Sequence, residues 1–278
     1  RVLEMCIGCG SCRRECPSHM DIPKLMLDAK AAWARRHGRG LDEWLLSNAE
    51  RLSKINQSFR AIAVPVMRMK ASRKLLEAAT GIDARREMPP VHAPAQPRRL
   101  LEGTAGEPRT SVVYLADIYA RYNDPSLAVA AVEVLEHNGV EVVQPPLRAA
   151  GVPSMIYGDS KGARRDAQYN IDLLTEHVEA GRLIVSTEPT ATLALRERYV
   201  DYVPTDAARR VARNARDLFE FLRERMRASL LRTPEAELPA RAAYHTPCHV
   251  KCLENGRPAV DVLGIVRQLT VEAIDEGC

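Results

Sequence analysis

A run of four closely spaced cysteines near the start of the chain limits what this sequence can fold into. The run is CIGCGSCRREC, and its thiols belong to Cys6, Cys9, Cys12 and Cys16. All seven cysteines gather toward the two ends of the 278 residues, which is not the pattern of a disulfide framework. In a reducing compartment, such bunching indicates binding of a metal or a cluster. Gly8 and Gly10 lie between the thiols and let the backbone wrap closely around a bound group.

The spacing C-x2-C-x2-C-x3-C followed by Pro17 is the one that bacterial ferredoxins use. In this spacing the first three cysteines bind one iron–sulfur cubane, and the fourth reaches a second cluster. Thiolates suit iron because they are soft, charged donors. Four cysteines could also bind zinc, but the spacing and the trailing proline favour a [4Fe–4S] cluster. Arg13 and Arg14 are expected to raise the reduction potential, because positive charge favours the reduced cluster.

The composition is that of a soluble globular protein and excludes several classes of function. Apolar residues make up 46% and charged residues 27% of the chain, and the formal net charge is +4. The arginines are scattered and not interleaved with aromatic residues, so we expect no nucleic-acid partner. No apolar stretch approaches the ~20 residues of a membrane span, and no signal peptide opens the chain. We therefore expect a cytoplasmic protein, or one peripheral on the inner face of the cytoplasmic membrane. We also expect both ends to be cut from a longer chain.

Helical periodicity dominates residues 1–85, which we expect to form an α-helical, ferredoxin-like cluster domain. The predicted helices cover 21–38, 41–63 and 69–80. The apolar pattern of the second helix runs through Trp44, Leu45, Leu52 and Ile55. Residues 86–110 are rich in proline, so we expect a stiff linker there.

From residue 111 the pattern changes to strands alternating with helices, which is typical of an α/β domain with parallel strands. The predicted strands cover 111–116, 140–144, 182–187, 240–247 and 270–274. The predicted helices cover 125–139, 160–181, 190–199, 205–226 and 257–268. Thr205 is expected to cap the fourth of these helices. The sequence thus predicts an α+β protein, in which an α-helical domain precedes an α/β domain.

The α/β region contains an internal repeat of a strand–helix–strand unit. One unit begins in the first predicted strand of this region and the other in the fourth, with a helix and a second strand of matching order and length. In the loops of these units, Ile118 lies 31 residues before Ala149, and Cys248 lies 30 residues before Cys278. The alternative is that any two strand–helix units of similar size would align this well.

These motifs resemble those of the iron–sulfur proteins that serve flavin dehydrogenases. That family includes the iron–sulfur subunits of anaerobic glycerol-3-phosphate dehydrogenase and glycolate oxidase, and fused FAD-linked D-2-hydroxyacid dehydrogenases. Its members share two ferredoxin-type cysteine runs and two cysteine-rich "CCG" domains, which also occur in heterodisulfide reductases. The resemblance covers nearly the whole chain through CRRECP, SKINQSF, LLEAATGID, YNDP, GVP, STEPTATLALRERY and YHTPCH. YHTPCH is the most specific of the later motifs.

The resemblance implies a role for individual positions. The family's second ferredoxin run is matched by Cys6, Cys9, Cys12 and Cys16. Cys248 matches the first cysteine of the second CCG motif, and Cys278 the first of its Cys-Cys-Gly, so this unit at 231–278 is truncated. In the first CCG unit, at 111–230, the family's cysteines are replaced by Ile118, Ala149, Ala150 and Ala191.

The four cysteines of the run do not complete a cluster by themselves, and the same resemblance implies where the other ligands lie. One [4Fe–4S] cluster would be bound by Cys6, Cys9 and Cys12, with its fourth ligand outside this sequence. Cys16 would bind a second [4Fe–4S] cluster shared with sequence outside this chain. Cys248 and Cys278 are not expected to complete the first site, because both follow the proline-rich linker.

The function that the resemblance implies is an iron–sulfur electron-transfer module. An FAD-containing dehydrogenase subunit or fused domain would oxidise a 2-hydroxy acid or glycerol 3-phosphate, and the electrons would pass towards a quinone or another respiratory acceptor. A membrane anchor or quinone-reducing subunit would be a further partner. We recognise no flavin or substrate site in the chain, so its own status as an enzyme stays open. The alternatives are a heterodisulfide-reductase-like catalytic subunit with a cluster site at Cys248 and Cys278, and a redox-inert scaffold.

Three further groups of residues receive structural interpretations. Cys252 has no counterpart in the family motif and is expected to be a small buried residue. His245 and His249 are expected to make structural hydrogen bonds. The segment YARYNDP is expected to form a turn before a helix whose first residue is Pro125.

Overall fold

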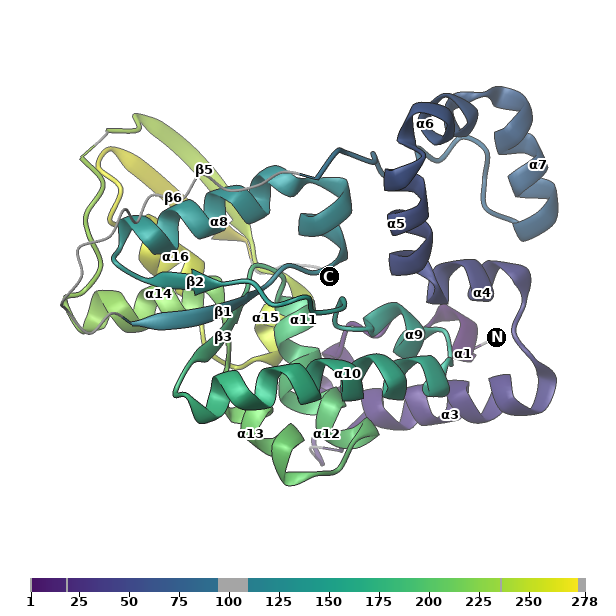
Figure 1. The fold of residues 1–278 in the computed structure, drawn as a ribbon, viewed down its shortest axis with the longest axis horizontal. Helices are drawn as coiled ribbons and strands as arrows, with labels where there is room; N and C mark the ends of the chain where they lie inside the picture. Colours follow the sequence, from purple (N-terminus) through teal and green to yellow (C-terminus); the bar gives the residue numbers. More distant parts are fainter. Residues whose placement is uncertain (1, 19, 95–109, 236, 275–278) are drawn as a thin grey trace.

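The structure is a computed structural model that describes residues 2–18, 20–94, 110–235 and 237–274. Its mixture of helices and small parallel sheets confirms the predicted α+β class (Figure 1). The helices before the sheets are α1 (Val2–Met5), α2 (Ser11–Glu15), α3 (Ile22–His37), α4 (Leu41–Ser47), α5 (Ala49–Ser58), α6 (Arg60–Arg68) and α7 (Lys70–Thr80). No helix among the described residues combines the length and the apolar character needed to cross a membrane.

The single helix predicted at 41–63 is wrong, because α4, α5 and α6 share this stretch. The helical backbone is interrupted at Asn48, between α4 and α5, and at Phe59, between α5 and α6. Their φ/ψ angles are −100°/24° and −110°/26°. Trp44 is 43% exposed and Ile55 is 47% exposed, and α5 buries none of its residues. The apolar periodicity of this stretch therefore belongs to partly solvent-facing helices and not to a packed core.

The α/β part is built on a four-stranded parallel sheet with the strand order β2-β1-β3-β4. Its strands are β1 (Ser111–Leu115), β2 (Glu141–Val143), β3 (Leu183–Ser186) and β4 (Ala215–Asp217). A separate two-stranded sheet pairs β5 (Ala240–His245) in parallel with β6 (Leu269–Ile274). Every strand pair among the described residues is parallel, as the alternation of strands and helices predicts.

Helical elements cover both faces of the four-stranded sheet. These elements are η1 (Tyr119–Asn123), α8 (Pro125–His137), α9 (Val152–Ile156), α10 (Ser160–Glu179), α11 (Pro189–Leu193), η2 (Ala194–Arg198), α12 (Tyr199–Tyr202), α13 (Asp206–Asn214), α14 (Leu218–Arg227), α15 (Cys248–Cys252) and α16 (Pro258–Leu263). Val113 and Leu115 pack with α10 and α13 on one face, whereas Val112 and Tyr114 pack with α8 and α14 on the other. Because successive strand residues point to opposite faces, a strand covered on both sides is apolar throughout.

The helix predicted at 205–226 is wrong in its middle, where β4 separates α13 from α14. Ala215 takes an extended backbone (φ −80°, ψ 136°), and the strand that it starts pairs with β3. Asp217 then begins a new helix, because its carboxylate accepts the N–H of Phe219 at 3.0 Å. The cap predicted at Thr205 is confirmed, since its side chain accepts a backbone N–H at the start of α13.

The two predicted repeat units share the order of their elements. β1-α8-β2 and β5-α16-β6 each run strand, helix and parallel strand. The predicted match in helix length is wrong, because α8 has 13 residues and α16 has 6. The repeat is therefore one of topology, and the second unit is the smaller.

Most of the predicted linker, residues 95–109, lies outside the described residues. The part before it is tied to η1, since the side-chain amide of Asn123 donates to the carbonyl of Pro90 at 2.9 Å. The predicted turn is confirmed in this region, where η1 takes a π-helical turn over Tyr119–Asn123. Pro125 is the first residue of the following helix, as expected.

Helix α3 approaches the α/β part closely at Gly158, between α9 and α10. Gly158 has φ +73°, and a Cβ placed there would lie 2.9 Å from the Cβ of Ala34 and 3.0 Å from the carbonyl oxygen of Lys30. Contacts this short force a neighbour to move, and one neighbour is helix backbone. A glycine therefore permits the contact between the N-terminal helices and the α/β part.

We expect Gly158→Ala to destabilise the protein more than a glycine substitution elsewhere at the same φ. Gly81→Ala is the matched control, because Gly81 also has φ +73° and nothing lies within 4 Å of the position that a new methyl group would take. Both variants should lose about 1 kcal/mol from the unfavourable backbone, and Gly158→Ala about 1–3 kcal/mol more from overpacking. Urea unfolding measures the two free energies, and equal losses would contradict the close approach of α3.

Candidate functional site

The cysteine run forms a tight loop between α1 and α2. Gly8 and Gly10 have φ of +72° and +78°, a left-handed backbone that glycine adopts readily. Gly10 is also the N-cap residue of α2. The four thiols of the run are all half-buried: Cys6 and Cys9 lie on this loop, Cys12 lies on α2, and Cys16 is the C-cap residue of α2. The two glycines thus allow the tight path that the sequence predicts for this segment.

The structure does not gather these thiols into a ligand set. Within the described residues, no group of three or more His, Cys, Asp or Glu side chains is arranged to hold a metal ion. Burial raises the pKa of Cys12, and charge on Cys9 and Cys6 adds to the rise, so these thiols are close enough to interact. The donor set fits an iron–sulfur cluster in its chemistry, since it offers half-buried thiols on a loop of left-handed glycines. A bound [4Fe–4S] cluster would supply one-electron transfer.

Helix α15, from the far end of the chain, packs onto this loop through His249. Its Nε2 lies 2.9 Å from the carbonyl oxygen of Gly8, and its Nδ1 lies 2.7 Å from the hydroxyl of Thr190. A carbonyl oxygen can only accept, so Nε2 carries the proton, and Nδ1 accepts from Thr190. The prediction that His249 makes structural hydrogen bonds is confirmed.

Cys252 lies directly against the cysteine loop. It is buried, and its thiol donates to the carbonyl oxygen of Cys9 at 3.5 Å. A Cβ at Gly10 would lie only 2.4 Å from its sulfur. The guanidinium of Arg13 donates to the carbonyl of Cys252 at 3.0 Å and pairs with Glu197 at 2.8 Å. Cys252 is buried as predicted, but its place against the loop was not predicted.

The remaining predicted ligands lie in different surroundings. Cys248 is the half-buried first residue of α15 and, among the described residues, joins no group of three or more possible metal ligands. Its helix contacts the N-terminal loop through His249 and Cys252, although it follows the proline-rich segment. Cys16 is the C-cap residue of α2. Cys278 lies outside the described residues. The six described cysteines form no disulfide with one another.

A further basic residue lies near the loop, in addition to Arg13 and Arg14, which the sequence singles out. Arg13 is compensated by its ion pair with Glu197, and Arg14 is exposed. The ammonium of Lys30, on α3, donates to the carbonyl oxygen of Cys6 at 2.6 Å. No motif marks Lys30, because the contact joins residues 24 positions apart.

Carboxylates hold the backbone at Ala149 and Ala150, two of the positions at which we expect the family's cysteines to be replaced. Ala149 and Ala150 are buried, and their N–H groups donate at 2.9 Å to Glu50 and Asp117. Arg121 pairs with Glu50 at 3.3 Å. No sequence motif marks these carboxylates. The contact of Glu50 with Ala149 joins residues that are 99 positions apart along the chain.

Glu188 is a third carboxylate at this end of the sheet. It accepts the N–H of Ala120 at 3.0 Å. Burial, with the charge of Asp117 in addition, raises the pKa of Glu188 to about 7. The folded protein therefore holds a proton between about pH 4.5 and pH 7 that the unfolded chain releases, and its stability falls as the pH rises through this range.

We expect Glu188→Gln to flatten the pH dependence of stability. The amide oxygen can still accept the N–H of Ala120 but cannot ionise. Between about pH 5 and pH 8, the native protein should lose up to ~3 kcal/mol of unfolding free energy relative to this variant. The control is Glu87→Gln, which removes an exposed carboxylate and should leave the profile unchanged. Identical pH profiles for native protein and Glu188→Gln would contradict the raised pKa.

The chain is similar in sequence to dehydrogenase proteins. It is 26% identical over 269 residues to the C subunit of anaerobic glycerol-3-phosphate dehydrogenase from Escherichia coli K12, a match that covers 94% of this chain and 66% of the relative. The D-2-hydroxyglutarate dehydrogenase of Haemophilus influenzae is 19% identical over 218 residues (71% of this chain, 20% of the relative). That of Pseudomonas putida is 23% identical over 204 residues (70% and 20%).

These similarities confirm the resemblance that the motifs predict. The chain spans just under two thirds of the length of the glycerol-3-phosphate dehydrogenase relative that it matches, and a fifth of each D-2-hydroxyglutarate dehydrogenase. No family model matches the chain, and no solved structure matches it significantly.

Proposed function

We propose that this chain is the iron–sulfur electron-transfer module of a flavin-dependent dehydrogenase. The observation that carries the proposal is the ferredoxin spacing of the cysteine loop, whose two left-handed glycines suit a wrapped cluster. Similarity to a dehydrogenase subunit over 94% of the chain supports it. In this proposal Cys6, Cys9 and Cys12 bind one [4Fe–4S] cluster, and Cys16 binds a second that is shared with sequence outside this chain.

The electrons come from FAD on a partner subunit or a fused domain. The relatives are named for glycerol 3-phosphate and D-2-hydroxyglutarate, which supports glycerol 3-phosphate or a 2-hydroxy acid as the compound oxidised. The electrons then pass towards a quinone or another respiratory acceptor, with a membrane anchor or a quinone-reducing subunit as partner. Residues 1–85 act as the cluster domain, and the CCG-like units at 111–230 and 231–278 support it.

The chain's own residues prepare the loop for this role. Lys30 and His249 each hold one loop carbonyl, which fixes the path of the backbone between the first two cysteines. Cys252 fills the space beside Gly10 and shields this side of the loop from water. Burial and nearby hydrogen bonds tune the potential of an iron–sulfur cluster, so these contacts are expected to adjust it.

Iron and acid-labile sulfide counts on anaerobically purified protein test the proposal. Cys12→Ser should lower both counts and abolish the reduced-state EPR signal of the cluster. Cys252→Ser is the matched control, because it changes a neighbouring thiol outside the proposed ligand set and should retain its iron. A colourless, zinc-loaded native protein without an EPR signal would overturn the proposal.

Because of the position of Cys248, the iron counts should also test the alternative of a heterodisulfide-reductase-like catalytic subunit. Cys248 begins the helix that packs on the cysteine loop, so a second cluster site would lie beside the first. An additional cluster that is lost only in Cys248→Ala would favour a heterodisulfide-reductase-like function. Unchanged iron in that variant would favour the electron-transfer module.

A further inference from the structure

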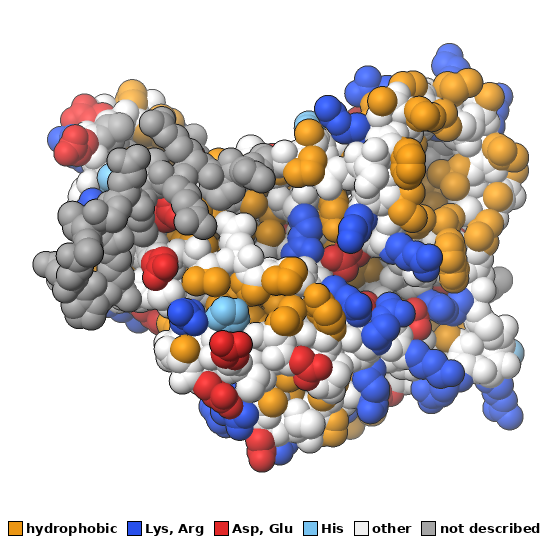
Figure 2. Space-filling model, viewed as in Figure 1, with side chains coloured by type: hydrophobic (Ala, Val, Ile, Leu, Met, Phe, Trp, Pro, Cys, Tyr) orange, Lys and Arg blue, Asp and Glu red, His pale blue; other side chains and the backbone are white. Residues whose placement is uncertain are grey.

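A charged cleft lies between α5 and the segment that carries α9 and the start of α10. Its volume is about 430 Å³, which is within the range of small-molecule sites. Figure 2 shows basic side chains gathered at the junction between the N-terminal helices and the α/β part. The proposed electron transfer uses none of these residues.

One wall of the cleft is formed by Arg51 and Lys54 on α5. The two residues are three positions apart on one helix, so they share a face. Both are exposed, and neither has an ion pair or a hydrogen bond from its side chain within the described part of the chain. Their charges are therefore available to a ligand.

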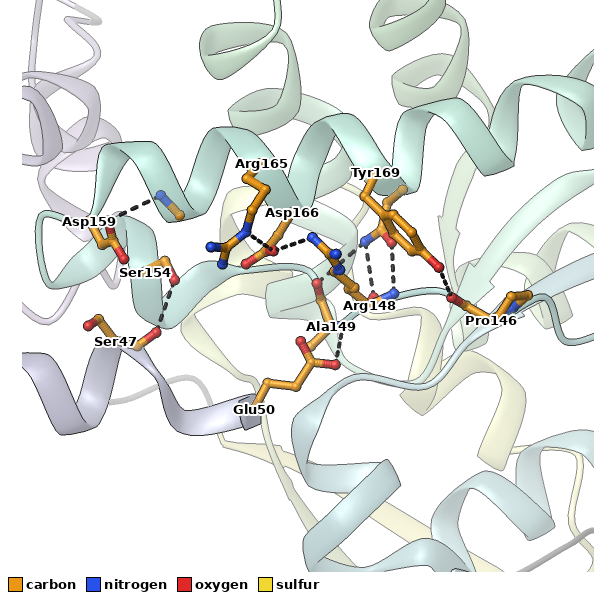
Figure 3. A network of polar contacts seen from close by, with 12 residues as sticks. Ser47, Glu50, Pro146, Arg148, Ala149, Ser154, Asp159, Arg165, Asp166 and Tyr169 are labelled. Carbon is orange, nitrogen blue, oxygen red and sulfur yellow. Dashed lines mark hydrogen bonds and ion pairs between the residues drawn. The ribbon is translucent and has the colours of Figure 1, made fainter. Parts of the chain in front are cut away.

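The opposite wall is formed by Arg148 and Arg165, which share one carboxylate. Asp166 accepts from Arg148 at 2.9 Å and from Arg165 at 3.2 Å (Figure 3). The guanidinium of Arg148 also lies over the ring of Tyr169, 4.2 Å from its centroid. Each guanidinium has five N–H donors, so donors remain for a bound anion.

The backbone behind this wall is held in place. The buried side chain of Asn170 accepts the N–H of Arg148 at 2.8 Å and donates to its carbonyl at 3.0 Å. At the end of the cleft, the hydroxyl of Ser154 donates to the carbonyl of Ser47 at 3.0 Å, which ties α9 to α4 (Figure 3). The wall is thus organised before any ligand arrives.

Positive charge exceeds negative charge around the cleft. Its lining carboxylates are Glu50, Asp159 and Asp166. Each is paired with arginine, Glu50 with Arg121 and Asp159 with Arg39 in addition to the pairs of Asp166. Four cations and three carboxylates therefore line the cleft, and Arg39 and Arg121, which lie outside the lining, pair with two of these carboxylates. The charges of Arg51 and Lys54 are left over and favour an anionic ligand.

We infer that this cleft binds a small organic dianion, either a phosphate monoester or a dicarboxylate. The single phosphate of a monoester contacts both pairs, Arg51 with Lys54 and Arg148 with Arg165. The two carboxylates of a dicarboxylate each contact one pair. A short carbon skeleton between them covers Ile118 and the backbone beside it, which line the cleft. The binding site is separate from the cysteine loop and does not depend on a bound cluster.

Calorimetric titration of the as-isolated protein with methyl phosphate and with succinate tests this inference. At least one probe should bind saturably at submillimolar concentration and low salt, and the preferred probe identifies the ligand class. The neutral diamide of succinate should not bind. The double variant Arg51→Gln/Lys54→Gln should weaken binding at least tenfold.

The matched control is Lys74→Gln/Arg227→Gln, which removes two exposed positive charges outside the cleft. It lowers the net charge equally and should change the affinity less than twofold. Arg148→Gln should also weaken binding at least tenfold, because it removes a charge from the opposite wall. Failure of both probes to bind at millimolar concentration, or equal losses in the two double variants, would overturn the inference.

Discussion

The docking of α15 on the cysteine loop is the contact on which the candidate site depends. His249 reaches a loop carbonyl across 241 residues of sequence, and Cys252 fills the space that Gly10 leaves open. Arg13, on α2, donates a hydrogen bond to the carbonyl oxygen of Cys252. Three contacts of different kinds thus join one short helix to one short loop. The path of the loop is therefore supported by contacts from the α/β part.

The sheet could be predicted from the sequence because its central strands are apolar along their whole length. Val112 and Val113 point to opposite faces, and helices bury both. β4 could not be predicted in the same way, because Ala-Arg-Asp has neither the apolar run of a buried strand nor a glycine or proline to end the helix before it. Its strand conformation follows from pairing with β3, which is a tertiary effect.

The candidate site likewise has local features that the sequence predicts and long-range contacts that it does not. The spacing of the thiols and the need for Gly8 and Gly10 are local properties, so the sequence revealed them. The contacts of Lys30, Cys252 and Glu50 were not predicted, because each acts on a segment that is remote in sequence. The proline-rich segment suggested separation of the two halves, whereas the contacts of α15 bring them together. A linker's composition predicts its stiffness and does not fix how its flanking parts pack.

The carboxylates that accept from the backbone of Ala149 and Ala150 also contribute to the charged character of the neighbouring cleft. Without thiolates, the buried N–H groups of Ala149 and Ala150 need acceptors, and an unpaired buried donor is costly. Asp117 and Glu50 supply these acceptors. Glu50 is only partly exposed, and Arg121 pairs with it. Glu50 also lies in the wall of the cleft, so the carboxylate that accepts the N–H of Ala149 contributes an ionic group to this wall. The hydrogen bonding of the Ala149 backbone and the charge of the cleft beside it are thus linked through Glu50.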